Sequence, residues 1–286
     1  MNPDCIMCHF RRNVDIVRNL GTRSQLDEFS KGLLKLYLQV PEGTSTVWTG
    51  PGTDELYERI YGITGDRYAQ EKEFSNRFVM ERMDQIRARA ESAEDPVYAG
   101  LQLAILGNYI DFSALQGQIS FEKLDQMLAQ ADSIAVDRQA YAKLCDDLEA
   151  GKRLLYITDN AGEIGFDRIF AEAIAKRYPQ VQITFCVRGG ATINDATRAD
   201  AEAVGIPFPV IDNGNTIAGT MMEFLSDEAK QAMDAADVII AKGMANVETL
   251  LDTGYNIYYA FLIKCVRFEE RFGKPRMTPM LVRERG

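Results

Sequence analysis

An alternation of short apolar runs with helical segments after Gly151 is the sequence feature that most constrains the fold. Four runs rich in β-branched and aromatic residues lie at 153–158, 182–188, 208–212 and 237–243. Such runs are typical of strands buried on both faces of a parallel sheet, and the intervals of about twenty to thirty residues between them suit crossover helices. We therefore expect a doubly wound, mostly parallel, Rossmann-like α/β/α domain over residues 151–286. Residues 258–265 should form its last strand and 267–286 a polar tail.

Residues 1–150 have a different pattern, in which apolar side chains recur three and four positions apart. This spacing is clearest in 27–40, 53–63, 72–90 and 121–131. It predicts an all-helical N-terminal domain, 1–150, of roughly five to seven helices separated by Pro- and Gly-containing turns. The segment 102–112 is apolar enough to be a buried helix.

Charge and composition exclude several classes of protein. The formal net charge is −10, and no run rich in Lys and Arg could attract a nucleic acid backbone locally. No stretch of apolar residues is long enough to cross a membrane, and the N-terminus lacks the pattern of a secretory signal. We expect a cytoplasmic protein without nucleic acid or membrane partners, and its oligomeric state stays open.

Polar residues follow the first two predicted strands, at the edge of the sheet where α/β proteins bind ligands. Asp159 and Asn160 come directly after the first strand, and Asp195 ends a glycine-flanked loop after the second. Their oxygens suit a cation such as Mg²⁺. The alternative is that these Asp and Asn residues only cap the helices that follow.

Two lysines are candidates for binding an anionic ligand at the same edge. Lys242 ends the fourth strand and begins a segment that also holds Gly243, Asn246 and Glu248, although a lysine after a strand is commonly just solvated. Lys264 falls within the apolar run predicted as the last strand, where a buried ammonium requires a partner.

The segments Asp-Asn-Ala-Gly-Glu (159–163), Asn-Asp-Ala (194–196) and 242–248, with Cys5 and Cys8 as an N-terminal Cys-x-x-Cys, resemble the damage-control phosphatases, also known as domain of unknown function 89. The resemblance covers nearly the whole chain, including a segment similar to 107–112, and the cysteine pair is similar to that of the prokaryotic branch. It implies a phosphatase that depends on a divalent metal (Mg²⁺, Mn²⁺, Co²⁺ or Ni²⁺) and acts on small phosphorylated metabolites, such as sugar phosphates or damaged phosphometabolites.

The same resemblance implies roles for individual residues. The metal ligands are Asp159, Asn160 and Asp195; Glu163 lies beside the metal; the 242–248 segment borders the substrate; and Lys264 contacts the phosphate. The nucleophile is either a water at the metal, with Glu163 as proton acceptor, or Asp159 itself.

Other roles are less closely defined by the sequence. Asn108 and Asp111 are candidates for substrate binding, and a buried structural pair is the alternative reading. Cys5 and Cys8, with His9, make an incomplete zinc-type motif, for which a structural or redox-inert role is favoured. Two rival functions stay open: a carboxyl methyltransferase using S-adenosylmethionine, and a metabolite-binding protein without catalysis.

Overall fold

The computed structural model describes residues 1–109, 125–126 and 128–284. Helices dominate the part before residue 151: α1 (Pro3–Val17), α2 (Arg23–Gln39), η1 (Thr46–Thr49), α3 (Gly50–Tyr61), α4 (Ala69–Met80), α5 (Met83–Ser92), α6 (Pro96–Tyr109), η2 (Ala131–Ser133) and α8 (Arg138–Ala150). Strands and helices alternate after it: β1 (Arg153–Ile157), α9 (Glu163–Arg177), β2 (Gln182–Val187), α10 (Arg198–Ala203), β3 (Val210–Asp212), η3 (Met222–Phe224), α11 (Asp227–Ala235), β4 (Val238–Lys242), α12 (Gly243–Leu250), β5 (Ile257–Leu262), α13 (Val266–Phe272) and β6 (Pro279–Glu284).

The six strands form one sheet in the order β3-β2-β1-β4-β5-β6. Strands β1 to β5 are parallel, and β6 pairs antiparallel with β5. This mixed, mostly parallel sheet confirms the predicted fold class. The strand order runs outward in both directions from the neighbours β1 and β4, so their carboxyl ends mark the point where ligands bind in doubly wound proteins.

The C-terminal residues correct one expectation. Residues 267–286 were predicted to be a polar tail, but the structure places α13 and β6 there, and β6 pairs along the full length of β5. Pro279 begins β6, and the charged residues Arg283 and Glu284 end it. Proline and charge are typical of a strand at the edge of a sheet, which is where β6 lies.

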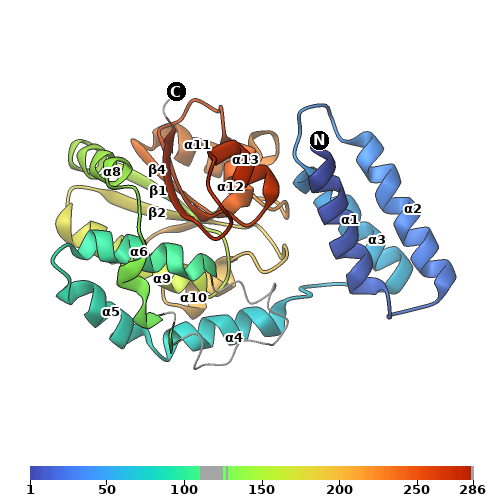
Figure 1. The fold of residues 1–286 in the computed structure, drawn as a ribbon, viewed down its shortest axis with the longest axis horizontal. Coiled ribbons are helices and arrows are strands. Elements are labelled where there is room, and N and C mark those ends of the chain that lie inside the picture. Colours follow the sequence, from blue (N-terminus) through green and yellow to red (C-terminus); the bar gives the residue numbers. More distant parts are fainter. Residues whose placement is uncertain (110–124, 127, 285–286) are drawn as a thin grey trace.

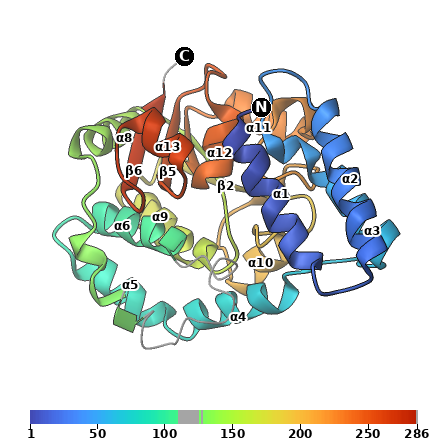
Figure 2. The same ribbon diagram turned by 45° about the vertical axis from the view of Figure 1, so that its right-hand side comes forward.

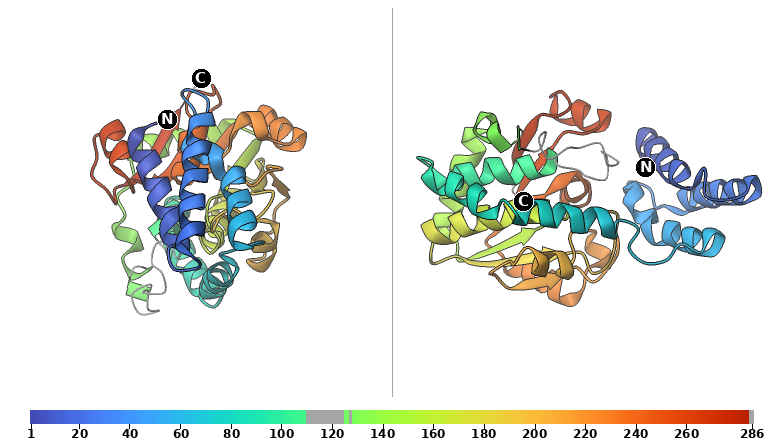
Figure 3. Two further views of the ribbon diagram at one scale, coloured as in Figure 1. Left: turned by 90° about the vertical axis from the view of Figure 1, so that its right-hand side faces the viewer. Right: turned by 90° about the horizontal axis from the view of Figure 1, so that it is seen from below.

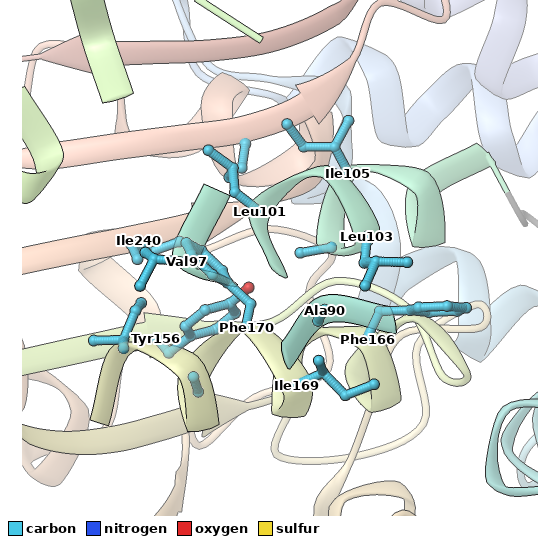
Figure 4. Close-up of a cluster of buried hydrophobic side chains, with 14 of the residues drawn as sticks. Ala90, Val97, Leu101, Leu103, Ile105, Tyr156, Phe166, Ile169, Phe170 and Ile240 are labelled. Carbon is cyan, nitrogen blue, oxygen red and sulfur yellow. The ribbon is translucent and has the colours of Figure 1, made fainter. Parts of the chain in front are cut away.

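Both faces of the sheet are covered because successive side chains of each strand point to opposite sides. Leu154 and Tyr156 of β1 belong to the apolar core on the side of α5, α6 and α9, whereas Leu155 and Ile157 belong to the core on the side of α11, α12 and α13. Figure 2 shows these two groups of helices on opposite sides of the sheet. Figure 4 shows α6 and α9 side chains, among them Leu101 and Phe170, packed around Tyr156 and Ile240.

Helices α1, α2 and α3 form a separate apolar core of their own, which includes Phe29, Leu33 and Tyr57. They stand beside the rest of the molecule (Figures 1 and 3). Helices α4, α5, α6 and α8 instead share the core of the sheet. The change from helices to alternating strands falls near residue 150, and the buried cores divide the chain between α3 and α4.

In the described ranges, no helix is long and apolar enough to cross a membrane. The buried helix expected over 102–112 corresponds to α6, in which every residue from 97 to 108 is buried. The end of the expected segment, which includes Asp111, lies outside the described residues.

Candidate functional site

The candidate site lies where β1 and β4 end, at the point where the strand order reverses. Asp159 follows β1 and Gly243 follows β4. Gly243 has a φ of +76°, and a Cβ atom at this position would lie 2.0 Å from Oδ2 of Asp159. The Asp159 carboxylate therefore occupies the space that only a glycine leaves above the start of α12.

Two side-chain amides orient the Asp159 carboxylate. Asn160 and Asn108 each donate from Nδ2 to its Oδ2 at 2.9 Å. The same two nitrogens donate to Oε2 of Glu163, at 2.8 Å from Asn160 and 2.9 Å from Asn108. Since Asn108 lies at the end of α6 and Glu163 begins α9, one buried network ties the turn after β1 to two helices.

Asp195 reaches the site from the loop after β2. The backbones of Asn160 and Asp195 form an isolated antiparallel bridge, and the amide of Ala196 donates to the carbonyl of Asp159 at 2.7 Å. Arg188, which is 2% exposed, donates from Nε to Oδ2 of Asp195 at 2.7 Å. The predicted metal ligands Asp159, Asn160 and Asp195 are thus brought together.

These residues do not cap the helices that follow them, which was the alternative reading of the sequence. Helix α9 has Gly162 at its N-cap and no side-chain cap bond. Helix α10 is capped by Thr197, in a capping box with Asp200. Asp159, Asn160 and Asp195 are therefore buried polar groups with no helix-capping role.

Electrostatics make this group of carboxylates costly to ionise. Burial, followed by the charges of Glu163 and Asp195, raises the pKa of Asp159 well above its ordinary value, although Lys264 and Arg188 act to lower it. Burial also raises the pKa of Asp195, and its bond to Arg188 opposes that effect. Buried carboxylates that repel each other are stabilised by a cation between them.

The donor set has two carboxylates and one amide oxygen. Within the described ranges, no group of three or more His, Cys, Asp or Glu side chains is placed to hold a metal. Hard divalent cations accept carboxylate and amide oxygens together and commonly keep water in their remaining positions. Asp159, Asn160 and Asp195 fit that chemistry as a partial ligand set.

Lys242 differs from its predicted role in substrate binding. Its side chain is fully buried, and its ammonium donates to Oε1 of Glu163 at 2.5 Å, to Oδ1 of Asp167 at 2.8 Å and to the carbonyl of Ala104 at 2.8 Å. These three acceptors use the three protons of the ammonium. Lys242 therefore neutralises acidic groups beneath the site and does not face a ligand.

We expect Lys242→Met to lower the free energy of unfolding by about 3–5 kcal/mol, because it leaves the buried carboxylates of Glu163 and Asp167 without their cation. Denaturant unfolding at neutral pH measures the change. Lys176→Met is the matched control: Lys176 is 76% exposed in its ion pair with Glu91, so its loss should cost less than about 0.5 kcal/mol. Equal, small effects of both substitutions would contradict the assignment.

Other predicted substrate residues are also engaged by the protein. Asn246 is buried; its Nδ2 donates to the carbonyls of Thr158 and Lys242, and its Oδ1 accepts from Thr220 and Arg188. It joins α12 to the ends of β1 and β2. Glu248 accepts from Ser45 Oγ at 2.6 Å and lies 3.5 Å from Arg267, so it links α12 to the segment before η1.

Lys264 lies two residues beyond β5, which corrects the expectation that it is a lysine within a strand. The last residue pair of β5 and β6 is Leu262 and Pro279, and Ile263 makes the final backbone hydrogen bonds, to Thr278 and Met277. The charge of Lys264 acts on the Asp159 carboxyl, and the backbone nitrogen of Lys264 contacts Sδ of Met244. Lys264 is therefore close to the site, but from a loop.

The structure adds residues that the sequence reasoning missed. Arg188 binds Asp195, Asp167 binds Lys242, and Asn76 of α4 accepts from the backbone nitrogen of Gly162 at 2.7 Å. Glu163 and Asp167 are four residues apart on the buried face of α9. Two buried carboxylates this close together need a neighbouring cation, so their spacing could have indicated a buried lysine such as Lys242.

All five cysteines are free, and Cys5 and Cys8 both lie on α1.

The chain is similar in sequence and in fold to several known proteins. The family model described as the damage-control phosphatase ARMT1-like domain matches residues 1–278. An uncharacterized protein of Methanocaldococcus jannaschii is 33% identical over 96% of this chain and 92% of its own length. A damage-control phosphatase of Archaeoglobus fulgidus is 31% identical over 73% of this chain and 74% of its own. The crystal structure of a DUF89 family protein from Pyrococcus horikoshii superposes with a TM-score of 0.84 at 26% identity, covering 99% of this chain and 98% of that one.

Proposed function

The chain belongs to the damage-control phosphatase ARMT1-like domain family, and we propose that it is a metal-dependent phosphatase acting on small phosphorylated metabolites. The observation that carries the metal dependence is the pair of buried carboxylates of Asp159 and Asp195, which repel each other near the point where the strand order reverses. Relatives named as damage-control phosphatases support the phosphatase activity.

Asp159, Asn160 and Asp195 would hold the divalent cation, which would supply charge neutralisation at the phosphoryl oxygens. The chain's own residues fix those ligands before substrate arrives. Arg188 orients Asp195, and the amides of Asn108 and Asn160 orient Asp159. Held in this way, the ligands would need little rearrangement as charge develops on the phosphate, which is how electrostatic preorganisation lowers a barrier.

Glu163 is better suited to positioning than to accepting a proton. Its Oε1 accepts from Lys242, and its Oε2 accepts from both Asn108 and Asn160. Donors of the protein therefore occupy three of the roughly four acceptor positions of this carboxylate. The proton-acceptor role of Glu163 stays a prediction, and we favour a role in which it holds the two amides in place.

Lys264 and water complete the proposal. Lys264 would neutralise a phosphate oxygen from the loop after β5, since its charge already acts on Asp159. We favour water over Asp159 as the nucleophile, because the hydrogen bonds to Oδ2 and the close backbone of Gly243 restrict the movement that an attack by Asp159 requires.

The test is release of phosphate from p-nitrophenyl phosphate by the purified protein, with Mg²⁺, Mn²⁺, Co²⁺ or Ni²⁺ added singly and with a chelator. We expect turnover with at least one cation and its loss with the chelator. Turnover that survives the chelator would contradict the metal dependence. Absence of turnover with every cation, together with methyl transfer from S-adenosylmethionine, would support the rival methyltransferase.

A further inference from the structure

A small pocket lies between the N-terminal helices and the loop that carries Asp195. It has a volume of about 80 Å³ and is lined by α1 and α3, by the segment that follows α3, and by loops after β2 and β3. Thr192 is part of its wall, and the carbonyl of Thr192 accepts from the backbone nitrogen of Asp195 at 2.9 Å. The pocket therefore adjoins the candidate metal site through a single turn of the chain.

The charge of this pocket is opposite to that of the protein as a whole. Arg12 and Arg67 line it together with one carboxylate, Asp54. His9, which also lines it, is neutral at pH 7, because burial and the charge of Arg12 lower its pKa to about 4. Two guanidinium groups against one carboxylate leave a net positive wall in a chain of net charge −10, and a cleft focuses such a field on an incoming anion.

Arg67 is held rigidly in the pocket wall. Its guanidinium donates to Oδ1 of Asp54 at 2.8 Å and lies 4.2 Å from the ring centre of Tyr57. Arg12 donates to the hydroxyl of Tyr68 at 3.2 Å. An arginine fixed by an ion pair and an aromatic ring loses little further conformational freedom when it binds an anion.

Two polar atoms of the pocket lining lack hydrogen-bond partners. In the described part of the chain, five buried side-chain nitrogen or oxygen atoms have none, and two of the five belong to Arg67 (Nε) and Thr192 (Oγ1). Thr192 is only 8% exposed. Buried donors without partners are costly, so an anion that accepted hydrogen bonds from these two residues would be stabilised.

We propose that this pocket binds a second anionic group, a carboxylate or a phosphate, at the end of the substrate remote from the phosphate that is hydrolysed. The proposal rests on the proposed phosphatase function and deepens it: the substrates are small phosphorylated acids or bisphosphates. The volume supports one functional group rather than a whole ligand, because it holds a few water molecules and is well below the size of a drug-like site.

The test compares substrates that differ only in the second anion. The pairs are 3-phosphoglycerate with glycerol 3-phosphate, 6-phosphogluconate with sorbitol 6-phosphate, and glucose 1,6-bisphosphate with glucose 6-phosphate. In the wild type we expect kcat/KM to be about tenfold or more higher for the anionic member of at least one pair, as for a charge-assisted hydrogen bond. The carboxylate and phosphate pairs distinguish the two kinds of anion.

Variants then locate the source of that preference. Arg67→Met should reduce the ratio to about three or less, and so should Thr192→Val, which removes an unpartnered hydroxyl and should fold normally. Arg59→Met is the matched control, because Arg59 is an exposed α3 arginine paired with Glu28 outside the pocket; it should leave the ratio unchanged. If Arg67→Met does not fold, Thr192→Val decides.

Two results would overturn the proposal: ratios near one for all three pairs, or a high ratio that Arg67→Met and Thr192→Val both leave intact. If p-nitrophenyl phosphate and all six compounds are not hydrolysed with any cation, the phosphatase proposal fails separately. Calorimetric titration of the same pairs in a chelator then tests the pocket without turnover, since tighter binding of the anionic member should again depend on Arg67.

Discussion

Asp159→Asn should lower kcat/KM for p-nitrophenyl phosphate by roughly a thousandfold or more, which is the scale of losing a principal electrostatic group in an active site. The two residues have the same shape, so the amides of Asn108 and Asn160 can still reach an oxygen at this position. What is lost is the negative charge that would hold a divalent cation. Steady-state kinetics with saturating Mn²⁺ measure the change.

The same substitution should stabilise the protein when no metal is present. The charges of Glu163 and Asp195 act against ionised Asp159 in a buried site, so removing its charge should raise the free energy of unfolding by roughly 1–2 kcal/mol. Adding Mn²⁺ should stabilise the wild type by mass action and leave the variant nearly unchanged. The order of melting temperatures should therefore reverse when Mn²⁺ is added.

Asp146→Asn provides the control, because Asp146 is a carboxylate 70% exposed on α8. It should change neither turnover nor the response to Mn²⁺. Full turnover in Asp159→Asn with metal still bound would sink both a ligand role and a nucleophile role for Asp159.

The strands near the site were predictable because each is a continuous apolar run in a parallel sheet, and their carboxyl ends had to meet at one edge. This reasoning places Asp159, Asn160 and Asp195 together, as the structure does. The same reasoning did not predict β6, because an edge strand that contains proline and charged residues has the composition of a loop.

The packing of the helices could not be predicted from periodicity. An amphipathic pattern shows that a helix buries one face, but it does not identify what that face contacts. Helices α4 and α5 have the same kind of pattern as α2 and α3, yet they pack against the sheet while α2 and α3 pack with α1. The division of the cores after α3 follows from tertiary contacts alone.

The role of Lys242 was missed for a related reason. Its position after a strand is compatible with a solvated or ligand-binding ammonium. Only the fold places it under α9, against Glu163 and Asp167 and the carbonyl of Ala104 from α6. A residue at the edge of a sheet can therefore support the site from inside the protein, as a cation that holds neighbouring carboxylates in place.

Gly243→Ala should reduce kcat/KM by roughly a hundredfold or more, although Gly243 has no side chain to contribute. The added Cβ would lie 2.0 Å from Oδ2 and 2.2 Å from Cγ of Asp159, so the carboxylate or the start of α12 must move. A displacement of about 1 Å is enough to cost two orders of magnitude in rate. Affinity for Mn²⁺ should fall in parallel, because the displaced group is a proposed ligand.

Gly254→Ala separates this clash from backbone strain. Gly254 has a φ of +85°, close to the +76° of Gly243, but no atom lies within 4 Å of the Cβ it would gain. Both substitutions place an alanine in the left-handed region, which lowers the stability of each variant by about 1–2 kcal/mol. This loss is the same in the two variants and cancels in their comparison. Only Gly243→Ala should lose activity and Mn²⁺ affinity, and its additional loss of stability over Gly254→Ala measures the clash. Equal activity in the two variants would show that the position of Asp159 does not control turnover.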